Sequence, residues 1–224
     1  MKRAYYTILA LIIAGSSCTK TSTTTDTIVP DKYISVSAGS TWNYRLVNNI
    51  AATTTNYVLA STSRDSTING KAYHVFTNSN TGNNEYYYTT GNDYYAYRTL
   101  GVLSSVQVED NYLKDNSPAG TSWSQSYNIS VPGLPIAVPV TITYTIQEKG
   151  ISRTVNGITY TDVIHVSGVI TSSLVPSSGL VTDIQNYFAR KYGFVETNNK
   201  VNLNFMGFTQ NVDNKTTLVS ADIK

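Results

Sequence analysis

The chain has 224 residues, with 16 lysines and arginines against 14 aspartates and glutamates. Without residues 1–17, which hold Lys2 and Arg3, the remainder has 14 charges of each sign and is formally neutral. No basic stripe interleaved with aromatic residues is present, which argues against nucleic acid as a partner. The single cysteine excludes an internal disulfide.

Residues 1–17 have the pattern of a signal peptide: two cations, an apolar run from Ala4 to Ala14, then small residues. The run is shorter than the roughly 20 residues that a membrane-spanning helix needs. Ser16-Ser17-Cys18 resembles a bacterial lipobox, which predicts lipidation of Cys18 and a membrane partner through the lipid anchor. The rival interpretation is a conventional signal peptide with an unrelated cysteine. Residues 18–30 are polar and threonine-rich, as in a flexible tether.

The rest of the chain predicts an all-β fold with antiparallel sheets, because Tyr, Thr, Ser, Asn and Val dominate. Apolar and polar residues alternate over 42–46, 140–146 and 201–205, which is typical of strands with one dry and one wet face. Asn69-Gly70, Gly91-Asn92 and Asn156-Gly157 are expected to form the hairpin turns between strands.

The sequence also indicates an internal duplication. Ala38–Tyr44 is echoed by Ala119–Tyr127, each with one of the two tryptophans, and Thr67–Tyr73 is echoed by Thr154–Tyr160. We therefore expect two β-meander repeats, of about 31–110 and 111–224, within a single β domain over 31–224. Two repeats are too few for a long solenoid, so we expect them to close on each other as a curved sheet: a half-barrel, a barrel or a sandwich.

One segment, residues 180–192, allows two predictions. Leu180, Ile184, Tyr187 and Phe188 are among apolar residues at helical spacing, and Gly193 would end such a helix. The alternative is a hairpin in which Tyr187–Arg190 and Phe194–Glu196 flank the glycine. The aromatic residues on both sides of a turn-capable glycine favour the hairpin.

With Ser17-Cys18, the Gly39-Ser-Thr-Trp42 opening, the Asn-Gly-x-x-Tyr hairpins and the Tyr187–Glu196 run, the chain resembles secreted lipoproteins of Bacteroidetes-type bacteria. Many of these families have no assigned activity. The resemblance implies a β half-barrel or lipocalin-like domain, and some proteins of this architecture carry lipids or lipoproteins. It also implies a place in the bacterial cell envelope, as an outer-membrane lipoprotein facing the periplasm or the cell surface.

No pattern in the sequence predicts a catalytic residue, a metal site or a cofactor. His74 and His165 each follow an Asn-Gly turn and have no His-x-x-x-His partner, so we interpret them as half-buried sheet residues. Glu109 and Asp110 would point to opposite faces of a strand, and we assign them to a linker over 109–116. Neither a Gly-x-Ser-x-Gly elbow nor a phosphate-binding glycine loop occurs. We therefore expect the protein not to be an enzyme.

Two binding hypotheses follow from the aromatic residues. In the first, an apolar small molecule or lipid lies in a concave sheet lined by Trp42, Tyr44, Trp123, Tyr144 and Phe205. In the second, a glycan or protein binds exposed tyrosines of the 18 in the chain, namely Tyr87, Tyr95 and Tyr97. Cross-strand tyrosine pairs that merely stabilise hairpins are the simpler explanation of the second set. A hydrolase that depends on a single Glu or Asp is the third and weakest hypothesis.

Overall fold

A computed structural model of the chain describes residues 32–100, 107–130 and 136–224. The predicted signal peptide 1–17, Cys18 and the tether 18–30 lie outside the described residues. Within the described ranges the chain forms twelve β-strands and no helix. The strands are β1 (Thr41–Asn48), β2 (Thr53–Ile68), β3 (Lys71–Asn78), β4 (Asn84–Thr90), β5 (Asp93–Thr99), β6 (Gln107–Lys114), β7 (Ser122–Ser130), β8 (Ala137–Val155), β9 (Ile158–Ser172), β10 (Leu180–Ala189), β11 (Gly193–Phe205) and β12 (Phe208–Asp222).

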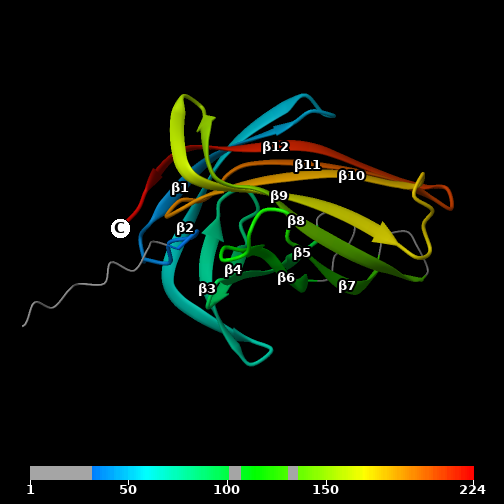
Figure 1. Ribbon diagram of the computed structural model, residues 1–224, viewed down its shortest axis with the longest axis horizontal. Helices are drawn as coiled ribbons and strands as arrows, with labels where there is room; N and C mark the ends of the chain where they lie inside the picture. Colours follow the sequence, from blue (N-terminus) through cyan, green and yellow to red (C-terminus); the bar gives the residue numbers. More distant parts are fainter. Residues whose placement is uncertain (1–31, 101–106, 131–135) are drawn as a thin grey trace, which may run out of the picture. The chain divides into compact units, whose positions relative to one another are not determined.

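All twelve strands belong to one antiparallel sheet, in the order β6-β5-β4-β3-β2-β1-β12-β11-β10-β9-β8-β7. Strands that follow each other in the chain are neighbours in the sheet, with β6 and β7 as the exception, and β1 pairs with β12. The sheet curves round so that its two edge strands, β6 and β7, come close to each other (Figure 1). The predicted all-β, antiparallel and curved meander is confirmed, and its form is a nearly closed barrel.

The predicted strand alternation decides which side chains fill the interior. In β8, Val140, Ile142, Tyr144 and Ile146 are all buried, and the threonines between them face outward. These threonines meet serines of β7 in three outward hydroxyl pairs, Ser122–Thr145, Ser124–Thr143 and Ser126–Thr141, each at 2.8 Å. Buried residues of β5–β11 and Tyr33 form one apolar cluster. A second cluster, around Trp42 and Tyr44, contains buried residues of β1–β3, β12 and part of β8–β11.

Tight turns join the strands where the sequence predicts them. Asn69 and Asn156 have positive φ angles of 50° and 51°, and each is followed by a glycine that also has a positive φ. This is the backbone of a two-residue hairpin turn. Residues 180–192 form a hairpin rather than a helix: β10 pairs with β11 in a register that places Ala189 opposite Gly193.

Side chains, rather than a backbone ladder, join the two edges of the sheet. Trp123 Nε1 donates to the carbonyl of Asn111 at 2.8 Å, and Tyr127 Oη donates to the carbonyl of Glu109 at 2.6 Å. Between them, Gln125 bonds to the backbone N–H and carbonyl of Asn111. We call this contact of β7 with β6 the seam. The three side chains occupy alternate positions of β7 and so point the same way.

The residues that suggested a duplication occupy matching places in the strand order. Trp42 lies in β1 and Trp123 in β7, each the first strand of six. His74 in β3 is paired with Asp65 of β2, and His165 in β9 is paired with Glu148 of β8. In both places the register shifts just before the acidic residue. The two-repeat division itself stays a prediction from the sequence.

Candidate ligand-binding cavity

A cavity of about 440 Å³ lies inside the curved sheet. Every strand except β7 contributes to its lining, together with Tyr33 and Ile34 from the segment before β1. The inward-facing side chains do not fill this part of the interior. The volume falls within the range of small-molecule sites, about 300–1,000 Å³. The cavity is therefore large enough to hold a ligand of modest size.

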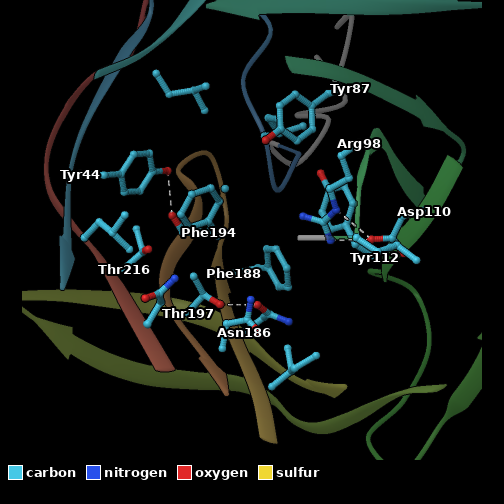
Figure 2. A pocket seen from close by; sticks show the side chains of 18 of the residues that line it. Tyr44, Tyr87, Arg98, Asp110, Tyr112, Asn186, Phe188, Phe194, Thr197 and Thr216 are labelled. Atoms are coloured by element: carbon cyan, nitrogen blue, oxygen red, sulfur yellow. Dashed lines mark hydrogen bonds and ion pairs between the residues drawn. The ribbon is translucent and has the colours of Figure 1, made fainter. Parts of the chain in front are cut away.

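Aromatic rings make up much of the cavity wall. Tyr44 stacks on Phe194 with ring centroids 4.4 Å apart and planes 11° apart, and its hydroxyl donates to the Phe194 carbonyl at 3.0 Å (Figure 2). Tyr112 packs on Phe188 at 5.5 Å. Burial raises the pKa of Tyr44 well above its usual value, so this phenol stays neutral. The wall is therefore apolar and uncharged over most of its extent.

One charged pair, Arg98 of β5 and Asp110 of β6, faces the cavity on another side (Figure 2). Arg98 Nε donates to Asp110 Oδ2 at 3.0 Å, and a second N–H of the guanidinium donates to the same oxygen. The Asp110 side chain is 0% accessible, whereas that of Arg98 is 49% accessible. Burial opposes the charge on Arg98, but Asp110 more than compensates and raises the pKa of the guanidinium above its usual value. Arg98 therefore remains a cation inside the protein.

Asp110 also connects the strands on both sides of the seam. Tyr144 of β8 donates to Asp110 Oδ2 at 3.1 Å, and Gln125 of β7 donates to Asp110 Oδ1 at 3.3 Å. Burial, with Asp110 as the next cause, raises the pKa of Tyr144, so its hydroxyl keeps the proton that it donates. A buried carboxylate needs such partners, because a buried charge without them is strongly unfavourable.

A polar patch lines the cavity on β10, β11 and β12. Asn199 lies directly opposite Asn214, and Thr197 directly opposite Thr216. Thr197 donates to Asn186 Oδ1 at 2.7 Å. The Oδ1 atoms of Asn199 and Asn214 are buried and have no hydrogen-bond partner among the described residues. A buried acceptor left in that state costs about 1–3 kcal/mol, which makes the patch a place where a bound molecule would gain hydrogen bonds.

The cavity brings together three of the five residues predicted to bind an apolar ligand. Trp42, Tyr44 and Tyr144 line it. Trp123 lies at the seam, where its indole N–H bonds to β6. Phe205 ends β11 beside the turn to β12 and packs against the apolar core. The predicted role of these residues in binding stays a prediction.

The three tyrosines of the surface hypothesis do not share one face. Tyr87 lines the cavity, because its register places it opposite Ala96, which is buried. Tyr95 and Tyr97 are half-buried and occupy the alternate positions of β5, on the outer face. There Tyr95 packs against Tyr88, with ring centroids 5.9 Å apart. Outward-facing tyrosines of neighbouring strands thus contact one another. This agrees with the simpler explanation, in which cross-strand tyrosine pairs stabilise the hairpins.

The sequence did not single out Arg98, and it assigned Glu109 and Asp110 to a linker, which was wrong. Both acidic residues lie in β6, because this segment pairs with β5 over its whole length. They point to opposite faces, as expected for neighbours on a strand: Asp110 faces the cavity, whereas Glu109 bonds to Lys71 at 2.6 Å outside it. Arg98 occupies the same set of alternate positions in β5 as Tyr94 and Ala96. This spacing was the feature of the sequence that could have indicated an arginine pointing into the interior.

A serine, a histidine and an aspartate meet in the order of a catalytic triad. Ser61 Oγ lies 2.9 Å from His74 Nε2, and His74 Nδ1 lies 2.9 Å from Asp65 Oδ1. Ser61 is only 4% exposed, however, and its hydroxyl lies within hydrogen-bonding distance of the carbonyl of Val36 at 3.0 Å. Its backbone N–H is also bonded, to the Ser40 carbonyl. The arrangement lacks access for a substrate, so we interpret it as a connection between β2, β3 and the segment before β1.

His165 has a comparable environment without a serine. Its Nδ1 lies 3.1 Å from Glu148 Oε2, and its Nε2 lies 2.6 Å from Gln185 Oε1. Tyr187 stacks on its ring at 4.3 Å. Among the residues with described positions, no group of three His, Cys, Asp or Glu side chains could hold a metal ion. The same part of the chain contains no helix that is long and apolar enough to cross a membrane.

The fold has a counterpart among solved structures. A crystal structure of a candidate lipoprotein from Parabacteroides distasonis matches with a TM-score of 0.51, over 87% of this chain and 100% of that chain. The two sequences are 11% identical, so the likeness concerns the fold alone. No protein-family model matches the sequence, and a search of curated proteins found no match.

Proposed function

We propose that the protein is a non-enzymatic, lipid-anchored protein of the bacterial cell envelope that binds an apolar small molecule or lipid inside its sheet. The observation that carries the proposal is the cavity of about 440 Å³, with an aromatic wall that includes Tyr44, Tyr112, Phe188 and Phe194. Interior space of this size lined by apolar side chains favours an apolar ligand, because binding removes apolar surface from water.

The cellular location of the protein is the second part of the proposal. The signal-like residues 1–17 and Cys18 support export and lipidation, and the tether 18–30 would hold the β domain near a membrane. The fold that the chain has in common with a candidate lipoprotein of Parabacteroides distasonis is compatible with this location. We place the protein in the outer membrane, facing the periplasm or the cell surface.

Native mass spectrometry tests the binding function. The mature chain, residues 18–224 with Cys18→Ser, would be purified without detergent, so that its own acyl chains cannot be mistaken for a ligand. We expect a bound apolar species that survives purification and is lost on solvent extraction. Asn214→Phe, which fills cavity space, should lower the occupancy, whereas Asn211→Phe at an exposed position of the same strand should not. A bare protein mass after exposure to envelope lipids would contradict the proposal.

A second candidate function is binding of a glycan or protein at the outer tyrosines. Tyr95 and Tyr97 support it, because both are partly exposed and Lys71 lies 5.1 Å from the Tyr95 ring centre. Here we expect Tyr95→Ala with Tyr97→Ala to reduce retention on cell-wall polysaccharide, with Tyr187→Ala on β10, outside this cluster, as the control. Unchanged retention would leave the tyrosine cluster with a structural role alone.

A further inference from the structure

The charge that the cavity presents to a ligand is positive. Arg98 and Asp110 are the only charged residues among the described residues that line it. Asp110 is completely inaccessible, and its oxygens already accept from Arg98, Tyr144 and Gln125. Half of the Arg98 side chain is accessible. A molecule in the cavity would therefore meet the guanidinium and not the carboxylate behind it.

Arg98 also has donors to offer. A guanidinium carries five N–H groups in a planar fork, and Asp110 accepts from two of them. The ring of Tyr112 lies 5.8 Å from the guanidinium carbon and so helps to fix its position. Because Asp110 holds the guanidinium in one orientation, little side-chain entropy remains to be lost when a ligand binds.

The part of the cavity opposite Arg98 contains hydrogen-bond acceptors that have no donor among the described residues. Figure 2 shows Arg98 and Asp110 on one side, Thr216 on the other, and the rings of Phe188 and Phe194 between them. Asn199 and Asn214 lie two residues along the same strands from Thr197 and Thr216, and their Oδ1 atoms lack donors. A hydroxyl of a ligand could donate to these oxygens, which neither an alkyl chain nor an anion can do.

We propose that the ligand is an amphipathic acid: a single apolar body with an anionic head, best a carboxylate, bound by Arg98, and a hydroxyl group that donates to Asn199 or Asn214. This inference rests on the proposed function and names the ligand class of the same cavity. The volume lies near the lower end of the usual range of about 300–1,000 Å³, which favours a one-chain acid over a two-chain phospholipid. The bidentate match of guanidinium with carboxylate supplies the selectivity.

The first test compares head groups on one alkyl chain. Dodecanoic acid, dodecyl phosphate, dodecan-1-ol and dodecylamine would compete with a fluorescent apolar probe for the wild-type mature chain. We expect the acid to bind at least tenfold more tightly than the alcohol, and the amine to bind most weakly. Tighter binding of the acid than of the phosphate assigns the site to free acids, and the reverse order assigns it to phosphate-bearing lipids. Equal affinities for acid and alcohol would overturn the inference while leaving the proposed function intact.

The second test removes the cation. Arg98→Gln alone would leave the buried Asp110 without its cation, so the variant combines Arg98→Gln with Asp110→Asn. We expect this variant to lose the preference for acid over alcohol and to keep its affinity for the alcohol. Arg45→Gln, which removes an exposed cation on β1, is the control and should behave as wild type. If the double variant still prefers the acid, Arg98 is not the recognition group. If no dodecyl compound binds the wild type, the proposed function fails as well.

The hydroxyl is tested separately with 12-hydroxyoctadecanoic acid against octadecanoic acid. We expect the hydroxy acid to bind several-fold more tightly to the wild type, and this advantage to disappear in Asn199→Leu with Asn214→Leu. Both residues lie on the lining, and the change leaves Arg98 untouched, so the preference for acids should persist in the variant. No advantage of the hydroxy acid in the wild type would remove this part of the inference.

Discussion

Gln125 pairs through its side chain with both main-chain groups of Asn111. Its Oε1 accepts from the Asn111 N–H at 2.8 Å, and its Nε2 donates to the Asn111 carbonyl at 3.1 Å. A residue of a neighbouring antiparallel strand makes the same two bonds with its backbone. The side-chain amide of Gln125 thus takes the place of the backbone of a strand residue. The backbones of β7 and β6 are therefore separated by the length of a side chain where the sheet closes.

Loss of this amide should destabilise the fold. We expect Gln125→Leu to lower the free energy of unfolding by about 1–3 kcal/mol, because the Asn111 N–H would be left without its acceptor and Asp110 Oδ1 would lose a donor. Urea denaturation measures the change. Ser126→Ala is the matched control on the same strand, since its hydroxyl pairs with Thr141 on the outer face. Equal losses in the two variants would mean that the seam contributes no more than a surface contact.

Asp110 should be among the most sensitive positions in the chain. Asp110→Asn removes the counter-ion of Arg98 and weakens the buried acceptor of Tyr144; because half of the Arg98 side chain is accessible and its charge can be screened, we expect a loss of about 1–3 kcal/mol. The control is Asp222→Asn, because the Asp222 and Lys224 side chains are both more than half exposed. Exposed pairs contribute only about 0–1 kcal/mol. Thermal and urea unfolding of both variants would show whether the difference exists.

Glu196 predicts how stability changes in acid. Burial would raise the pKa of this carboxyl, but Lys215 at 2.8 Å and Arg153 at 2.9 Å lower it below its usual 4.5. Because the pKa is lower in the folded state than in the unfolded state, the stabilisation is complete above pH 4.5 and is lost as the pH falls through the folded-state pKa. The gap in unfolding free energy between wild type and Glu196→Gln should therefore be largest at neutral pH and shrink below pH 4.5. A gap that stays constant down to pH 3 would contradict this.

The turn between β11 and β12 offers a stabilising change. Met206 has a positive φ of 54° and is 75% exposed, whereas Asn69 and Asn156 occupy the same place in two other turns before glycine. The left-handed region costs most residues about 1–2 kcal/mol, and Asn tolerates it. We expect Met206→Asn to raise the midpoint of urea unfolding, while Met206→Leu leaves it unchanged. If both variants match the wild type, the turn does not limit stability.

The sequence predicted the fold well because strand signals are local. Alternation over 140–146 indicated which residues of β8 share a face, and the structure buries that set. The same holds for Trp42 and Tyr44 in β1. The hairpin at Gly193 was also predictable, since the glycine and its flanking aromatics are neighbours in sequence. Each of these signals lies within a dozen residues.

The candidate site was less predictable because it depends on pairing between strands. Alternation shows that Tyr94, Ala96 and Arg98 share a face, but it does not show that this face is the interior. The partner of Arg98 is fixed by the register of β5 against β6, which shifts between Tyr94 and Tyr95. Tyr87 illustrates the same difficulty, since its register against Ala96 turns it inward. No pattern in a single strand carries this information.

The seam also has a consequence for how molecules of this protein meet one another. A strand edge with free N–H and carbonyl groups is a template on which a second chain can add a strand, the first step of aggregation or domain swapping. Backbone N–H and carbonyl groups of β6 that such a strand would use are already bonded. Their partners are side chains of β7, from Trp123, Gln125 and Tyr127. The protein thus protects an open edge with its own side chains, without a final backbone ladder.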